Sequence, residues 1–374
     1  MRDTPVIVFG AGATKDCGGP LTNEILHDAF KAELSQSQQQ AKIALVQQFL
    51  NDNFPPLRAE YKDYPSLPLL LSLLDTALDR KHAFGLQWPP ERVAEVRQAV
   101  EAAIFAVLDF RSPQAETASY MGLLQLAYPG PAPEARVISL NYDMILDMAM
   151  FDLSEQRMPG SMPSYGCDIR TQAYQNCLGR WGSLYKIHGS INWLYCSQCH
   201  HLDIGWSTKR GAPSRIGSVY FSLDQQYASI VNCPECSTRL RPILITPTYR
   251  KDYRNPHVSR IWYEAERALQ RANRVIFVGY SLPDDDVEVI YMLKRGLGAA
   301  NPAPLLPRQI TVIESDVQNR DLKTHPVGQR YRALFGDCID FRTEGFGPWL
   351  QACQLSNPLL LPGLPAPPLA PQKI

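Results

Sequence analysis

The stretch Val6-Ile7-Val8-Phe9-Gly10-Ala11-Gly12-Ala13-Thr14 decides the fold class of this 374-residue chain. Its four apolar residues are typical of a parallel strand that is buried on both faces. The glycines that follow predict a tight turn, where backbone N–H groups can approach a pyrophosphate. Lys15 stands where the full dinucleotide-binding pattern has its third glycine, so a simple turn explains this stretch equally well when it is taken alone.

Strand signals recur along the chain and alternate with helical segments. The predicted strands cover residues 136–140, 184–187, 243–245, 275–278, 310–313 and 339–341. Alternating strands and helices predict an α/β fold, here a doubly wound, Rossmann-like parallel sheet. We assign residues 1–193 and 241–350 to this domain.

A helical block interrupts the alternation after the first strand, from about residue 21 to residue 130. Residues 67–78 predict one helix, and apolar side chains at helical spacing after Pro89-Pro90 predict another. Residues 51–56 and 83–90 have the composition of loops. The block therefore reads as a helical insertion into the Rossmann-like domain.

Two Cys-x-x-Cys pairs predict a zinc-ribbon module at residues 194–240. Its ligands are Cys196, Cys199, Cys233 and Cys236, because two such pairs can surround one Zn²⁺ tetrahedrally. The first pair, followed by His200, also spells the haem-attachment pattern, but haem leaves the second pair unexplained. His200 or His201 can in principle serve as a ligand, although four cysteines suffice.

Polar motifs follow the predicted strands at their carboxyl ends, where open α/β sheets hold ligands. Asn141 and Asp143 can hold a carboxamide and orient a ribose hydroxyl or water, or they form an Asx turn that caps the next helix. A lone histidine is more often structural, but the strand-end position of His188 favours a general base. The common placement of these motifs predicts one shared site.

The later motifs offer further contacts with a nucleotide. Gly279-Tyr280-Ser281 is a second turn suited to phosphate, and Glu314 can bind ribose hydroxyls or be a solvated loop charge. The run Asp284-Asp285-Asp286 resembles a metal-binding acidic run, but we expect it to cap the following helix.

Composition excludes several classes of function. Basic and acidic residues number 37 each, so there is no global attraction to nucleic acid or anionic lipid. No apolar stretch approaches the roughly 20 residues that span a bilayer. Residues 5–9 suit a buried strand better than an export signal, so we expect a cytoplasmic protein with reduced cysteines. The proline-rich tail, residues 351–374, predicts a disordered extension or a strap that docks on a neighbouring subunit.

In this order, the motifs resemble those of the sirtuins, the silent information regulator 2-like proteins. The matching elements are a glycine–alanine–glycine loop, an Asn-x-Asp element, a His-Gly pair, a zinc ribbon, a Gly-x-Ser turn and an adenine-side loop. In this chain they are Gly10-Ala11-Gly12-Ala13-Thr14, Asn141-Tyr142-Asp143, His188-Gly189, the four cysteines, Gly279-Tyr280-Ser281 and Gly336-Asp337-Cys338. The resemblance covers residues 5 to about 345.

The resemblance implies that NAD⁺ is bound as a substrate and is cleaved between nicotinamide and ribose. His188 is then the general base, with Asn141 and Asp143 at the nicotinamide ribose. The residues expected to contact the dinucleotide are Gly10, Ala11, Gly12, Thr14, Asn141, Asp143, Gly279, Ser281, Glu314, Asp337 and Cys338.

Two segments depart from the protein-deacylating sirtuins. Residues 17–22 replace a Gly-Ile-Pro-Asp-Phe-Arg segment, and residues 245–251 replace a Phe-Gly-Glu stretch that pairs with substrate peptide. Pro247 lacks an N–H, which weakens such pairing. Residues 249–253 and the helical block resemble the bacterial sirtuin-like proteins of anti-phage defence, which typically hydrolyse NAD⁺.

The leading hypothesis is therefore an NAD⁺ glycohydrolase that depletes NAD⁺ in anti-phage defence. In this hypothesis Asp143 holds the nicotinamide carboxamide, while Asn141 and His188 position and deprotonate water or a ribose hydroxyl. The resemblance implies a homo-oligomer and a partner ATPase, translocase or sensor protein. Two alternatives stay open: a protein deacylase or ADP-ribosyltransferase, and a scaffold module that senses NAD⁺ or ADP-ribose without catalysis.

Overall fold

A computed structural model describes residues 5–31, 37–54, 64–111, 116–130, 135–204, 232–244, 255–298, 309–316, 318–319 and 321–356. One of the two segments that depart in sequence from the deacylating sirtuins, residues 245–251, lies outside the described residues, as do residues 249–253. The same holds for residues 357–374 of the tail. Residues 351–356, which the sequence analysis places in the tail, belong to helix α13 (Phe346–Ser356).

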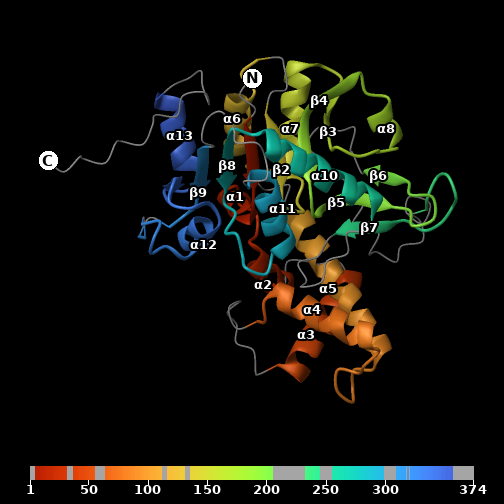
Figure 1. The fold of residues 1–374 in the computed structure, drawn as a ribbon. Helices are drawn as coiled ribbons and strands as arrows, with labels where there is room; N and C mark the ends of the chain where they lie inside the picture. The colour runs from red at the N-terminus through yellow and green to blue at the C-terminus, as the bar shows by residue number, and fades with distance from the viewer. Residues whose placement is uncertain are drawn as a thin grey trace.

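A seven-stranded sheet forms the centre of the molecule (Figure 1). Its order is β10-β9-β8-β1-β2-β4-β3, and the paired strands run parallel. The strands are β1 (Val6–Phe9), β2 (Arg136–Ser139), β3 (Ser161–Ser164), β4 (Gly179–Lys186), β8 (Arg274–Val278), β9 (Gln309–Ile313) and β10 (Ile339–Arg342). The strand order reverses between β1 and β8, which confirms the predicted doubly wound, Rossmann-like fold.

Helices follow the strands and cover the sheet. Helix α6 (Ala118–Ala127) packs against α7 (Ile145–Arg157) and α13, while α10 (Pro256–Arg271) packs against α11 (Val287–Leu297). Helix α12 (Pro326–Phe335) lies beside β10, and the short helices α1 (Ala11–Asp16) and α8 (Gln172–Gln175) follow β1 and β3. Phe9 of β1 contacts Tyr120 of α6 at 4.9 Å between ring centroids, which ties the central strand to this layer.

The helical block forms a lobe with its own hydrophobic core, below the sheet in Figure 1. It contains η1 (Thr22–Glu24), α2 (Ile25–Phe30), α3 (Ser37–Asn53), α4 (Leu67–Arg80) and α5 (Pro90–Arg111). The predicted helix start at Pro90 is correct. The loop predicted from residue 51 begins later, because α3 continues to Asn53.

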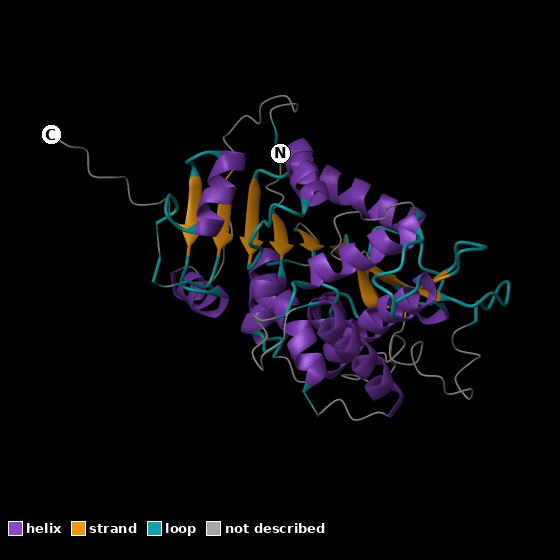
Figure 2. Ribbon diagram, turned by 90° about the horizontal axis from the view of Figure 1, so that it is seen from below, coloured by secondary structure: helices purple, strands orange, loops and turns teal. Residues whose placement is uncertain are grey.

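The cysteine module contains a small antiparallel sheet at one side of the molecule (Figures 1 and 2). Its central strand β5 (Gly189–Tyr195) pairs with β6 (Leu202–Ile204) and β7 (Arg241–Leu244). The strand predicted at residues 243–245 is thus part of this sheet and not of the large parallel one. Only Ile187 and His188 separate β4 from β5, so His188 lies where the two sheets meet.

Two glycine turns bring the backbones after β1 and β8 into direct contact. Gly12 N donates to Gly279 O at 2.8 Å, and Gly10 N donates to Val278 O at 3.0 Å. A Cβ added at Gly10 would lie 2.6 Å from Gly279 O, and one added at Gly279 would lie 2.1 Å from Ala13 N. Glycine is therefore required on both sides of the contact.

Replacing Gly279 by alanine should disrupt this contact. The added methyl group collides with backbone, and the left-handed φ of 60° alone costs about 1–2 kcal/mol for a residue with a Cβ. We expect Gly279→Ala to lower the free energy of unfolding by at least about 3 kcal/mol in urea denaturation. Gly18→Ala is the matched control: Gly18 also has a positive φ, 90°, but nothing lies within 4 Å of an added Cβ. Equal losses in the two variants would contradict a role for the close approach.

Candidate functional site

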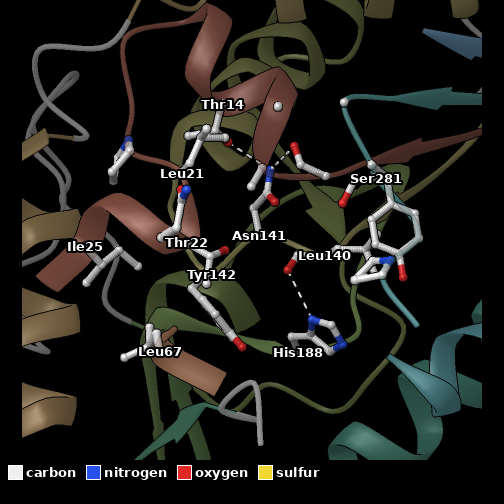
Figure 3. A pocket seen from close by; sticks show the side chains of 18 of the residues that line it. Thr14, Leu21, Thr22, Ile25, Leu67, Leu140, Asn141, Tyr142, His188 and Ser281 are labelled. Carbon is white, nitrogen blue, oxygen red and sulfur yellow. Dashed lines mark hydrogen bonds between the residues drawn. The ribbon is translucent and has the colours of Figure 1, made fainter. Parts of the chain in front are cut away.

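A cavity of about 500 Å³ lies at the carboxyl ends of the central strands, at the position where the strand order reverses. Open α/β sheets bind their ligands at this position. Most of the predicted site residues line it: Gly10, Ala11, Gly12, Thr14, Asn141, Asp143, His188, Gly279, Ser281 and Glu314. The structure thus brings together side chains that are far apart in the sequence (Figure 3).

Asn141 is oriented by a buried hydrogen-bond network. Its Nδ2 donates to Gly10 O at 2.9 Å and to Thr14 Oγ1 at 2.8 Å. Because the amide hydrogens bind the glycine turn and its neighbour, the Asn141 side-chain oxygen faces the cavity (Figure 3). Thr14 in turn donates to Asp143 Oδ2 at 2.9 Å, so one chain of hydrogen bonds joins the two predicted motifs.

Asp143 is almost entirely buried and accepts hydrogen bonds on both oxygens. Oδ1 accepts from Ile145 N at 2.9 Å, at the start of α7. The Asx interaction that the sequence left open is therefore present, together with the contact to Thr14. Burial raises the pKa of Asp143 above its ordinary value, and the nearby Lys186 ammonium opposes this effect.

A buried lysine supports the same loop from the protein interior. Lys186 Nζ pairs with Asp147 Oδ2 at 2.6 Å and donates to Asp143 O, and both charged side chains are fully buried. Tyr165 OH donates to Asp147 Oδ1 at 2.8 Å. Breaking such a pair by removing one partner typically costs about 3–5 kcal/mol, so the pair holds the loop firmly. These residues are not among the predicted site residues, although a lysine inside an otherwise apolar strand was a signal.

His188 is 6% exposed and has a defined orientation. Its Nδ1 lies 3.1 Å from Leu140 O. Since a carbonyl oxygen can only accept, Nδ1 carries the hydrogen and Nε2 is the nitrogen available for proton transfer. Tyr142 and Trp262 flank the ring at centroid distances of 6.1 Å and 6.3 Å. Trp262 also donates to Ile187 O at 2.7 Å, which fixes the backbone beside the histidine.

Asp286 is a cavity residue whose role the sequence analysis misassigned. We expected the run Asp284-Asp285-Asp286 to cap the next helix, and Asp286 does occupy the N-cap position of α11. Its side chain makes no capping hydrogen bond there, however. It accepts from Tyr280 OH at 2.7 Å, and its Oδ1 lies 3.9 Å from His188 Nε2. Asp285 lines the cavity as well.

The remaining residues that were predicted to contact the dinucleotide fall into two groups. Glu314 and Ser281 line the cavity, and burial raises the pKa of the Glu314 carboxyl group. Asp337 and Cys338 do not line it. Asp337 is paired on the surface with Arg332, and Cys338 is exposed.

The helical lobe supplies a largely apolar wall of the same cavity. The residues on this side are Pro20, Leu21, Thr22, Asn23, Ile25, Ser66, Leu67, Pro68 and Leu108. Tyr142 projects from the Asn141 loop toward this wall (Figure 3). No residue of the lobe is among the predicted site residues, because apolar side chains at helical spacing are typical of a hydrophobic core.

The four predicted metal ligands form a single cluster. The sulfur atoms of Cys196, Cys199, Cys233 and Cys236 all lie within 4.8 Å of one another. The Cys196–Cys236, Cys199–Cys233 and Cys199–Cys236 separations are 3.4, 3.5 and 3.7 Å. Tetrahedral Zn²⁺ with bonds of about 2.3 Å requires sulfur separations of about 3.8 Å, so the cluster fits zinc.

The two cysteine loops have the same conformation. His200 N donates to Cys196 O at 3.0 Å, and Ser237 N donates to Cys233 O at 2.9 Å. His200 and Ser237 both have φ of 61°. The histidine side chains have other partners, since His200 contacts Tyr195 and His201 contacts Glu235. The four-cysteine ligand set therefore needs no histidine.

Comparisons with known proteins give similarity at the level of three-dimensional structure. No protein-family model and no curated sequence matches the chain. A Sir2–p53 peptide–NAD⁺ structure is similar over 94% of this chain and 92% of its own, with 15% identity and a TM-score of 0.41. Two further structures are each similar over 96% of this chain and 94% of their own, with 14% identity. They are a Sir2 homologue mutant in complex with 2′-O-acetyl ADP-ribose, with a TM-score of 0.43, and Sir2Tm bound to a propionylated peptide, with a TM-score of 0.42. The fold class rests on the strand order described above.

Among the residues that the structure describes, no helix combines the length and apolar character needed to cross a membrane.

Zinc content tests the metal centre directly. We expect the purified protein to hold one zinc ion per chain, and Cys199→Ser to lose most of it, because three thiolates leave the shell incomplete. Elemental analysis of the two proteins measures this. Cys338→Ser, which alters an exposed cysteine away from the cluster, should keep its zinc. Zinc retained in full by Cys199→Ser would exclude the proposed ligand set.

The ionised Glu314 side chain should lower the stability of the folded protein at neutral pH. Because burial raises the pKa of Glu314 in the folded state, folding favours the protonated form, and stability falls as pH rises through that pKa. Glu314→Gln should therefore raise the melting temperature at pH 7–8, and the gain should vanish near pH 4. In Asp337→Asn no gain is expected, since Arg332 lowers the pKa of Asp337. An equal gain for Glu314→Gln at both pH values would rule out this ionisation effect.

Proposed function

We propose that this protein is a sirtuin-like NAD⁺ glycohydrolase that releases nicotinamide and ADP-ribose. The observation that carries the proposal is the meeting of the glycine turn, Asn141 and His188 at one cavity. This combination, in the order in which it occurs along the chain, resembles the sirtuin NAD⁺ site. A cavity of about 500 Å³ is also within the range that small-molecule sites occupy.

The dinucleotide would lie along the carboxyl edge of the sheet. We assign the pyrophosphate to the two glycine turns, where the missing side chains leave the backbone accessible. The adenosine end lies toward Glu314, and the nicotinamide ribose lies toward Asn141 and His188. The apolar wall of the helical lobe would exclude water from the nicotinamide end.

The reaction breaks the C1′–N bond, and the electron pair leaves with the nicotinamide nitrogen. Water then attacks the oxocarbenium-like C1′, and its proton passes to His188 Nε2, directly or through a ribose hydroxyl. The Asn141 side-chain oxygen accepts a hydrogen bond from that water. Asp143 holds the Asn141–Thr14 network in place, and its remaining lone pairs can accept from the nicotinamide carboxamide.

We further propose that the hydrolase is an effector that depletes NAD⁺ in anti-phage defence. The support is the resemblance of the sequence to that group of sirtuin-like proteins, including the helical block that here forms a separate lobe. In this proposal the chain forms a homo-oligomer that acts with a partner ATPase, translocase or sensor protein. An enzyme of this kind requires a trigger, so activity is to be measured for the chain alone and together with products of neighbouring genes.

His188→Ala should abolish NAD⁺ consumption while the protein still folds. General-base catalysis contributes about 10²–10⁴ in rate, so a loss of this size is expected in an assay that follows nicotinamide and ADP-ribose. His82→Ala, at an exposed position of the helical lobe, is the control and should keep full activity.

The same assay separates the alternatives. Nicotinamide release that requires an acylated peptide would identify a deacylase, and ADP-ribose attached to protein would identify a transferase. Binding of NAD⁺ with no nicotinamide release, even in the assembled complex, would identify a sensing module and refute the hydrolase.

A further inference from the structure

Asp286 reaches the His188 side of the cavity from a different loop than Asn141, Asp143 and His188. It follows β8 and directly precedes α11, and it is 8% exposed. Its Oδ1 lies 3.9 Å from His188 Nε2, the nitrogen opposite the one held by Leu140 O. This separation exceeds a hydrogen bond but lies within the range of an ion pair.

The Asp286 carboxylate is held in place by a buried tyrosine. Tyr280 OH donates to Asp286 Oδ2 at 2.7 Å, and Tyr280 is 6% exposed. Burial and the nearby Asp286 carboxylate raise the pKa of Tyr280 well above its ordinary value, so it remains a donor. Tyr331 OH donates to Tyr280 O at 2.8 Å and fixes the backbone of the same turn. Oδ2 is thus bound by Tyr280, and Oδ1 is directed at the histidine.

We propose that Asp286 is the ionic partner of His188, a positioning residue that strengthens it as a base. This inference rests on the proposed hydrolase. When His188 Nε2 takes the proton of water, the imidazole becomes a cation between two acceptors, Leu140 O and the Asp286 carboxylate. The negative charge stabilises that cation, because both side chains are shielded from solvent. The proton returns to solvent after ADP-ribose leaves.

Other titratable groups face the same space from different elements. Tyr142 flanks the imidazole ring, and Asp143 and Asp285 line the cavity. Tyr142 stays neutral because burial raises its pKa, and both oxygens of Asp143 are bound within the protein. The Asp286 carboxylate lies within ion-pair distance of His188 Nε2, at 3.9 Å.

A purely structural role for Asp286 makes a different prediction. If Asp286 only anchors Tyr280 and the start of α11, its replacement lowers activity equally at every pH. If it strengthens the base, its replacement slows the reaction at alkaline pH and also moves the acidic limb of the rate profile to lower pH. The second effect arises because the protonated imidazole has lost its negative partner.

The test is the pH profile of kcat/KM for NAD⁺ loss in the full chain, under the conditions in which the wild type is active. Asp286→Asn keeps the size and the hydrogen-bond acceptor but removes the charge. We expect it to lower kcat/KM by about 10–100-fold at pH 8 and to move the acidic limb to lower pH. Asp284→Asn removes the same charge from an exposed position of the same loop, outside the cavity lining, and should reproduce the wild-type profile.

An Asp286→Asn profile equal to wild type, or one lowered uniformly without a shift, overturns the inference and leaves the hydrolase proposal intact. Absence of NAD⁺ loss in the wild type refutes the hydrolase instead. In that case the pairing is still measured by NMR, as the pH midpoint of the His188 ring signal assigned with His188→Gln. A midpoint that falls to lower pH in Asp286→Asn supports the pairing, and an unchanged midpoint overturns it.

Discussion

The backbone contact between the turns after β1 and β8 is the constraint on which the site depends. Gly10, Gly12 and Gly279 let the two turns approach so closely that Gly12 N and Gly279 O form a hydrogen bond of 2.8 Å. Since the strand order reverses between these strands, helices diverge to opposite faces and a crevice opens at this point. The contact therefore fixes one edge of the cavity with backbone atoms, which leave no side chain in the way of a bound nucleotide.

A buried polar network fixes the positions of Asn141 and Asp143 at the neighbouring part of the cavity. Thr14 joins the glycine turn to Asn141 and Asp143, and the buried Lys186–Asp147 pair holds the carbonyl of Asp143. Buried polar groups are costly unless they are satisfied, so the network permits few other arrangements. Catalytic groups that are already oriented lose little free energy to reorganisation when substrate binds. The network has the form expected of a preorganised site.

The sequence predicted the strand-end residues well because their position follows from topology. A residue that directly follows a parallel strand must lie at the carboxyl edge, so Asn141, His188 and Gly279 could be brought together without coordinates. Asp286 could not, because it lies well beyond the end of β8, where the strand no longer determines the direction of a side chain, and because an acidic residue before a helix normally caps it. Asp337 does not reach the cavity for a different reason: it lies between α12 and β10, at the amino end of a parallel strand and therefore at the opposite edge of the sheet, where it pairs with Arg332. The antiparallel placement of β7 was also missed, because its apolar pattern does not reveal which sheet it joins.

The cysteine module and the edge of the cavity are connected directly through His188. Strand β4 of the large sheet becomes β5 of the small sheet with only Ile187 and His188 between them, and the imidazole is held by the carbonyl oxygen of Leu140, the residue directly after β2. The left-handed φ of Gly189, 80°, makes the sharp change of direction that separates the two sheets. Any movement of β5 against β4 would therefore move the His188 ring relative to Asn141 and Asp286. A metal held by the four cysteines at the far end of β5 would stiffen that strand, so the cysteine cluster would help to fix the position of His188 without lining the cavity itself.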